Sequence, residues 1–218
     1  MRSSARGLAA AFILALSTGF LAAAPAAAQD LQEGKNYFRF KTPVPVESGK
    51  KIEVIEFFSY GCPHCADLEP EMIPWMKTLP ADVQFRRVPV LFQDRWVVLG
   101  KVYFTLEALG EDQRLSPEVF VAIHQRGIDL SNEKKFFDWA VSKGLDRKKV
   151  EEMYSSFAIA GKINRAKQQA QAYNIQSVPT IVVDGKFMTA SDKVGTHAAM
   201  PAAINVLIAK ARAERPKS

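Results

Sequence analysis

One stretch of the chain constrains the fold and the chemistry more than any other. Residues 54–65 have the sequence VIEFFSYGCPHC, an apolar β-rich run that enters a glycine turn and ends in two cysteines. These are the only cysteines among the 218 residues, and two residues separate them. If a helix begins at Cys62, then Cys62 and Cys65 lie three positions apart on one face, close enough to form a disulfide bond. We therefore expect the chemistry of the protein to reside at this pair.

The two cysteines are expected to differ in acidity. Pro63 fits the first turn of a helix, where its missing N–H costs little. The Cys62 thiol would then lie over unpaired backbone N–H groups at the positive end of the helix dipole, which favours the thiolate. His64 can add positive charge or donate a hydrogen bond to the same sulfur. Cys65, one turn further along, is expected to be more buried and to stay protonated.

Other roles for a lone C-x-x-C pair fit this sequence less well. A structural zinc site needs about four nitrogen or sulfur ligands, and here it would have to recruit His64, His124 or His197 in a spacing that fits no common site. Covalent haem attachment requires histidine directly after the second cysteine, but Ala66 stands there. An inert structural disulfide is an alternative interpretation, although a disulfide that closes so short a loop stabilises the fold little by chain entropy. A redox-active disulfide is the favoured interpretation.

The first 28 residues have the pattern of a cleavable secretory signal. Arg2 and Arg6 supply the positive start, residues 8–24 form an apolar core, and Ala26-Ala27-Ala28 gives a small-residue cleavage site. The mature chain is expected to begin at Gln29. An uncleaved membrane anchor is the alternative. Export places the cysteines in an oxidising compartment, where such a pair can take part in making disulfides.

Charge and length limit the function classes further. The net charge is +6, and two of the basic residues belong to the predicted signal. The other basic residues are scattered and not interleaved with aromatic residues, so nucleic-acid binding is not expected. The chain after the signal is long enough for one sizeable core with an inserted subdomain.

The segments around the cysteines predict a parallel strand–helix–strand unit. Residues 51–58 form a nearly continuous apolar run, typical of a central strand covered on both faces. A helix over 62–79, interrupted by Pro70 and Pro74, and a strand over 83–90 complete a right-handed βαβ unit.

Residues 94–157 are interpreted as an all-helical insertion of four helices. Ser116-Pro117 has the composition of a helix start, Ser131 or Asn132 begins the third helix, and Asp146 begins the fourth. Glycine follows each of the first three helices, as is common at helix C-termini.

The rest of the chain supplies the second half of the sheet. After a helix over 159–173, Asp184-Gly185 stands between two β-rich runs, which is the strongest short signal for a hairpin. A closing helix is expected over 198–213. The chain is therefore divided into a signal (1–28), two parts of one α/β domain (29–93 and 158–218) and the helical insertion between them (94–157).

This order of elements resembles the thioredoxin fold, a central mixed sheet flanked by helices. The helical insertion, the export signal and the motif Cys62-Pro63-His64-Cys65 together resemble the DsbA family of periplasmic thiol:disulfide interchange proteins, over essentially the whole mature chain. Thioredoxins typically carry Gly-Pro between the cysteines, and bacterial disulfide isomerases Gly-Tyr. Val178 before Pro179 also resembles the oxidases, since isomerases usually have threonine there.

The resemblance implies a role for each residue of the motif. Cys62 resembles the exposed sulfur that client thiolates attack, and Cys65 resembles the buried resolving cysteine. His64, which follows Pro63, resembles the residue that most tunes the Cys62 thiolate.

Residues outside the motif also match the family. Pro179 resembles a cis-proline beside the disulfide, and the Val178 backbone is expected to pair with an extended client segment. Glu56 matches an acidic residue that the family buries under the active site, which implies a proton-relay role; a solvated strand end is the alternative. Glu69 matches a second family acid more weakly. At Tyr60-Gly61 the chain departs from the family, which commonly carries bulkier aromatic residues there.

The resemblance implies a monomeric enzyme that donates the Cys62–Cys65 disulfide to unfolded exported proteins with free thiols in the periplasm. The family passes the electrons to a membrane partner, the quinone reductase DsbB, and no flavin, haem or metal is implied. An isomerase or reductase on the same fold is one alternative. A second alternative is a secreted peptide-binding chaperone with a non-catalytic disulfide. Such a protein would still work after both cysteines were replaced by alanine.

Overall fold

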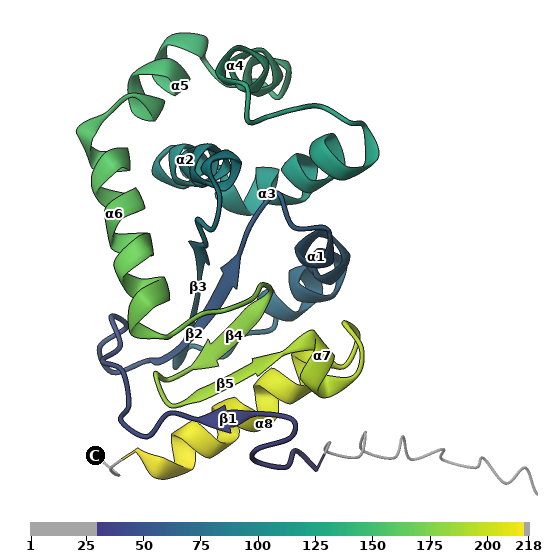
Figure 1. Ribbon diagram of the computed structural model, residues 1–218, viewed down its shortest axis with the longest axis vertical. Coiled ribbons are helices and arrows are strands. Elements are labelled where there is room, and N and C mark those ends of the chain that lie inside the picture. The colour runs from purple at the N-terminus through teal and green to yellow at the C-terminus, as the bar shows by residue number, and fades with distance from the viewer. Residues whose placement is uncertain (1–29, 216–218) are drawn as a thin grey trace, which may run out of the picture.

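The computed structural model describes residues 30–215, and one mixed sheet lies at the centre of the protein (Figure 1). The predicted signal and the predicted mature start at Gln29 lie outside these residues. The strand order is β1-β5-β4-β2-β3, in which β2 and β3 run parallel and the other neighbours antiparallel. The strands are β1 (Phe38–Arg39), β2 (Ile52–Phe58), β3 (Val83–Pro89), β4 (Thr180–Val183) and β5 (Phe187–Ala190).

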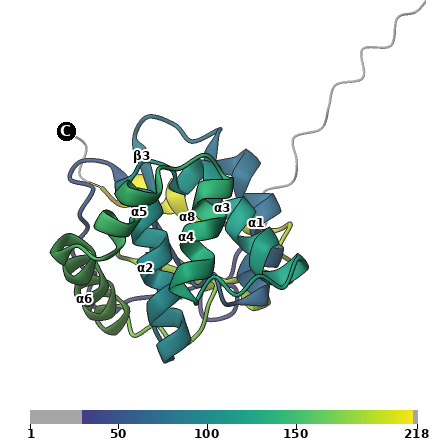
Figure 2. The same cartoon turned by 90° about the horizontal axis from the view of Figure 1, so that it is seen from above.

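Helices cover both faces and one end of the sheet. They are α1 (Pro63–Met76), α2 (Asp94–Ala108), α3 (Asp112–Phe120), the π-helical turn η1 (Val121–Gln125), α4 (Glu133–Ser142), α5 (Arg147–Tyr154), α6 (Phe157–Ala172), α7 (Ser191–Val194) and α8 (Met200–Glu214). Seen from above, α2 to α5 gather over the end of the sheet (Figure 2). Within residues 30–215, no helix is both long enough and apolar enough to cross a bilayer.

The strand before the cysteines is the centre of the core. Every residue of β2 is buried, as its apolar sequence predicts. Val54 packs into one apolar cluster with Met72 of α1 and Leu207 of α8. Phe57 belongs to the cluster on the other face, where its ring centroid lies 5.3 Å from that of Tyr173, the residue after α6. The predicted central strand covered on both faces is therefore confirmed.

The segment between β3 and β4 contains α2 to α6 and the turn η1, in agreement with a helical insertion. Asn132 and Asp146 are the N-caps of α4 and α5, since their side chains accept the backbone N–H of Lys135 at 3.1 Å and of Lys149 at 2.9 Å. α6 begins at Phe157. The division of the chain into domains at 94 and 157 stays a prediction.

One predicted helix start is wrong. Ser116-Pro117 lies inside α3, which begins at Asp112. The Ser116 side chain is buried and shares a hydrogen bond of 2.7 Å with the Tyr60 hydroxyl, so it does not cap a helix. Leu115 and Val119, one turn apart, are both buried in the core. Their burial outweighs the local start signal, because packing of an apolar face contributes more to a helix than its ends do.

The predicted hairpin is confirmed. Asp184 has φ 54° and Gly185 has φ 63°, and both connect β4 to β5. Positive φ at both central residues is the requirement of a type I′ turn. A Cβ atom at Gly185 would also lie 1.9 Å from the Val44 carbonyl oxygen, so no larger residue fits there.

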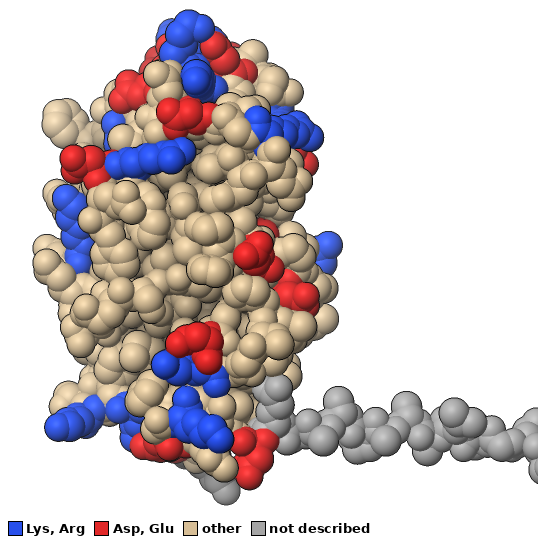
Figure 3. Space-filling model, turned by 45° about the vertical axis from the view of Figure 1, so that its right-hand side comes forward, with Lys and Arg blue, Asp and Glu red and all other residues tan. Residues whose placement is uncertain are grey.

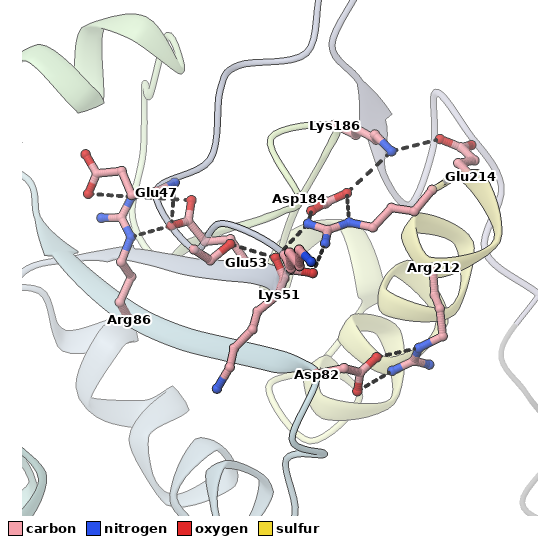
Figure 4. A network of polar contacts seen from close by, with 12 residues as sticks. Glu47, Lys51, Glu53, Asp82, Arg86, Asp184, Lys186, Arg212 and Glu214 are labelled. Carbon is pink, nitrogen blue, oxygen red and sulfur yellow. Dashed lines mark hydrogen bonds and ion pairs between the residues drawn. The ribbon is translucent and has the colours of Figure 1, made fainter. Parts of the chain in front are cut away.

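Ion pairs fasten the last helix to this hairpin and to the sheet (Figure 4). The buried Asp184 carboxylate accepts from Arg215 at 3.2 Å and lies 3.4 Å from Lys186. Arg212 of α8 donates two hydrogen bonds to Asp82, at 2.8 and 3.1 Å, just before β3. These contacts hold α8 against the face of the sheet that also carries α1.

Candidate active site

Cys62 lies at the junction of β2 and α1. It is the N-cap of α1 in extended conformation (φ −95°, ψ 119°), and Pro63 is at the first helical position. The turn before it is held by a hydrogen bond from the Cys62 N–H to the Ser59 carbonyl, 3.0 Å, and one from the Gly61 N–H to the Ser59 hydroxyl, 3.1 Å. The predicted helix start is confirmed, and the Cys62 side chain is set beside the free N–H groups of the first turn.

The two sulfurs differ in environment as predicted. Cys65 is completely buried, and Cys62 is 6% exposed; both are free thiols. The pKa of Cys62 is lowered from 9.0 to about 6, first by a hydrogen bond from the Cys65 thiol, then by the backbone N–H groups of Cys65 and His64 and by the charge of His64, while burial opposes. The pKa of Cys65 is raised well above 9.0, mainly by burial. Cys62 is thus the thiolate and Cys65 the thiol near neutral pH.

Cys62 is more covered than the expected exposed sulfur. The reason is the loop before β4, which lies against it: Sγ of Cys62 is 3.6 Å from the Val178 carbonyl oxygen, to which the protonated form of Cys62 donates a hydrogen bond. The Val178–Pro179 peptide bond is cis, as the family resemblance implies. Although 116 positions separate Cys62 from Val178, the fold places the two side by side.

A groove of about 430 Å³ opens next to this contact. It is lined by His64 from α1, by Val178 and Pro179, and by residues of α7 and the loop after it, including Ser191 and His197. The His64 side chain is 72% exposed. The predicted site did not include α7 or His197. The sequence of α7 is too short to show the periodicity that indicates a helix.

The loop residues that depart from the family pattern turn inward. Tyr60 is 1% exposed, and its hydroxyl bonds to Ser116 in the core. A Cβ atom at Gly61 would lie 2.6 Å from Nε1 of Trp96, so glycine makes room for this tryptophan of α2. Trp96 in turn stacks on the half-exposed Phe92, with centroids 5.8 Å apart. The aromatic surface beside Cys62 is therefore supplied by α2 and the residues just before it, which the sequence did not indicate.

Beneath the cysteines lies a buried cluster of two carboxylates and one guanidinium. Arg87 of β3 donates to Glu56 of β2 at 2.8 Å and to Glu69 of α1 through both of its terminal nitrogens. The exposed fractions are 1% for Glu56, 3% for Glu69 and 7% for Arg87. The alternative of a solvated strand end at Glu56 is thus wrong. The sequence did not indicate Arg87, because its partner depends on the parallel register that sets Glu56 opposite Arg87.

This cluster is able to hold a proton close to Cys65. Burial raises the pKa of Glu69, and the charge of Glu56 raises it further, while Arg87 opposes both. With one cation between two carboxylates, the fully ionised cluster carries one uncompensated negative charge, which a bound proton would cancel. The charge of Glu56 also contributes to the raised pKa of Cys65. The carboxylates are therefore electrostatically coupled to the resolving thiol.

The His64→Ala variant is expected to raise the pKa of Cys62 but to leave it below 9.0. The charge of His64 is a lesser cause of the low pKa, whereas the Cys65 thiol and the backbone N–H groups remain in the variant. The measurement is a titration of the reduced variant followed by thiolate absorbance. Asp192→Asn, which changes another residue of the same groove, is the control. An unchanged midpoint in His64→Ala would remove His64 from the account.

Two thiols of such different acidity, three positions apart at a helix start, can open and reclose a disulfide, because one leaves as a thiolate and the other resolves. On this fold, that chemistry defines a thiol:disulfide oxidoreductase with a thioredoxin-like domain. Comparison with known proteins narrows the class: the model of the DSBA-like thioredoxin domain matches residues 81–199. The chain belongs to the DsbA family.

Individual relatives agree with this assignment. The thiol:disulfide interchange protein DsbA of Pseudomonas aeruginosa is 43% identical over 182 residues, covering 84% of this chain and 85% of the relative. The protein of the same name from Azotobacter vinelandii is 39% identical over 180 residues, covering 83% of each. The crystal structure of Pseudomonas aeruginosa DsbA superimposes with a TM-score of 0.81 at 41% identity, covering 85% of this chain and 97% of that one.

Proposed function

We propose that the protein donates the Cys62–Cys65 disulfide to unfolded, newly exported proteins in the periplasm. The observation that carries the proposal is the pKa of Cys62, lowered to about 6. The hydrogen bond from the Cys65 thiol and the backbone N–H groups of His64 and Cys65 thus favour the thiolate of Cys62 over its thiol. Because only the reduced form contains this thiolate, its stabilisation favours reduction of the disulfide and makes it an oxidant.

The proposed reaction has two exchanges. A client thiolate attacks Sγ of Cys62, the bond to Cys65 breaks, and Cys65 leaves and takes up a proton, as its raised pKa favours. A second client thiolate then attacks the client sulfur of the mixed disulfide and releases Cys62 as a thiolate. The client loses two electrons and gains a disulfide, and the enzyme becomes a dithiol.

The other site residues have supporting roles in this proposal. The cis Val178–Pro179 segment lines the groove beside Cys62, and its backbone pairs with an extended client chain as an added strand would. Glu56, with Arg87 and Glu69, relays the proton that Cys65 takes up. The surface on the α1 and α7 side carries few charged side chains across its middle (Figure 3), which suits the apolar segments that unfolded clients expose.

Membership in the DsbA family supports a partner, a location and an oligomeric state for this enzyme. In this proposal the enzyme is a monomer that its signal directs to the periplasm. It passes the electrons taken from its clients to a DsbB-like quinone reductase in the membrane. The redox-active disulfide is then the only redox group that the chain itself needs.

The test is the equilibrium of the cysteine pair with glutathione. The Cys62–Cys65 disulfide is expected to be reduced at a low ratio of reduced to oxidised glutathione, and the protein should form disulfides in a reduced client quickly while correcting scrambled ones poorly. Trapping with an alkylating agent measures the first, and recovery of client activity measures the second. A disulfide that resists reduction, or efficient correction of scrambled clients, would favour the reductase or isomerase instead.

A further inference from the structure

Three side chains that can each supply one metal ligand meet at the rim of the groove. His64 and Asp67 lie three positions apart near the start of α1, and His197 lies in the loop between α7 and α8. One ligand atom from each lies within 4.8 Å of the other two. The two imidazole rings approach to 6.3 Å between centroids, across the boundary of two segments far apart in sequence. The fold, and not local spacing, thus creates this set of donors.

The three donors are close to the geometry of a bound zinc ion. With metal–ligand bonds of about 2.0–2.1 Å, the ligand atoms of a tetrahedral site lie about 3.3 Å apart. Nδ1 of His64 is already 3.9 Å from the Asp67 carboxylate. The side chains of His64 and Asp67 are 72% and 63% exposed. Small rotations in solvent therefore close the remaining gap without repacking the core.

His197 has an outer partner that orients its ring. Its Nδ1 lies 2.9 Å from the Ser191 hydroxyl. When that nitrogen carries the proton and donates to Ser191, Nε2 keeps its lone pair for a metal ion. A hydrogen bond on the second ring nitrogen is the usual feature of metal-binding histidines, because it fixes the tautomer and the direction of the ligand atom.

We propose that His64, Asp67 and His197 bind a zinc ion at the rim of the groove. Two imidazoles and one carboxylate are ligands that zinc accepts, and three protein ligands leave a fourth position for water. The site uses neither cysteine, so it differs from a structural zinc site built on the C-x-x-C pair. It is also independent of the proposed direction of disulfide exchange.

The experiment is calorimetric titration of zinc chloride into the oxidised protein, prepared without a polyhistidine tag. With the Cys62–Cys65 disulfide closed, no thiolate is available to bind the metal. The wild-type protein is expected to bind one zinc ion, and His197→Ala and Asp67→Asn are expected to weaken binding by about tenfold or more. Ser191→Ala should weaken it by about tenfold through the lost orienting bond. Asp192→Asn, on the same groove, should bind as wild type does.

Two results would overturn the proposal. One is the absence of zinc binding by the oxidised wild-type protein. The other is wild-type affinity in His197→Ala, with the fold of each variant confirmed by its melting temperature. Absorption spectra of the cobalt-loaded protein provide a second readout. A site of nitrogen and oxygen ligands shows no thiolate-to-cobalt absorption band. The appearance of that band would place the metal on sulfur and contradict the proposed ligands.

Discussion

Replacement of Cys62 by serine is expected to abolish disulfide transfer to a reduced client protein. Cys62 is the sulfur at the start of α1 whose pKa is lowered to about 6, and Cys65 is completely buried beneath it. The chain has no third cysteine that could take the place of Cys62. Client oxidation should fall to the rate seen without enzyme, measured by alkylation of the remaining client thiols. Activity at the wild-type level would contradict the proposed mechanism and favour a chaperone.

The Cys65→Ser variant is the matched control. Its Cys62 thiolate should attack a client whose one cysteine carries a disulfide-linked thionitrobenzoate, which forms the enzyme–client disulfide and releases thionitrobenzoate, the better leaving group. The enzyme–client disulfide should then persist, since no resolving thiol is present, and it should appear as a heavier band on non-reducing gels. Cys62→Ser should form no such band.

Replacement of Arg87 by methionine is expected to lower the free energy of unfolding by about 3–5 kcal/mol at neutral pH. Methionine keeps much of the side-chain length but leaves Glu56 and Glu69 buried without their cation. Burial and the charge of Glu56 raise the pKa of Glu69, and Arg87 opposes both, so its removal raises that pKa further. The loss of stability should therefore be largest above the pKa of Glu69 and shrink as the pH falls and this carboxylate takes up a proton. Denaturant unfolding at several pH values measures the effect.

Arg95→Met is the control for this prediction. Arg95 forms an ion pair with Asp129 at 3.4 Å in which both side chains are about half exposed. Exposed pairs of this kind contribute less than about 1 kcal/mol, so the variant should unfold almost as wild type does. Equal stability of Arg87→Met and Arg95→Met would show that the buried cluster contributes no more than a surface pair.

Features set by neighbouring residues could be predicted from the sequence. The burial of β2, the start of α1 at Cys62-Pro63 and the turn at Asp184-Gly185 each depend on a few adjacent residues. The N-caps Asn132 and Asp146 belong to the same group. In each case the residues that carry the signal also make the contact, so no knowledge of the rest of the fold is needed.

Features set by distant pairs could not be predicted in this way. Arg87 meets Glu56 only through the register of β2 and β3, and Gly61 is required because Trp96 of α2 lies against it. α3 begins before Ser116 because its apolar face packs in the core, where Ser116 shares a hydrogen bond with Tyr60. These contacts depend on packing between elements, which hydrophobic periodicity does not specify. The position of Pro179 beside Cys62 was expected from family resemblance, not from pattern.

The central claim is that the start of α1 holds Cys62 as a thiolate, and a titration of the reduced wild-type protein tests it most directly. Thiolate absorbance is expected to rise in two separate steps, the first with a midpoint of about 6 from Cys62 and the second well above 9.0 from Cys65. Two cysteines that titrate together near 9.0 would contradict the account.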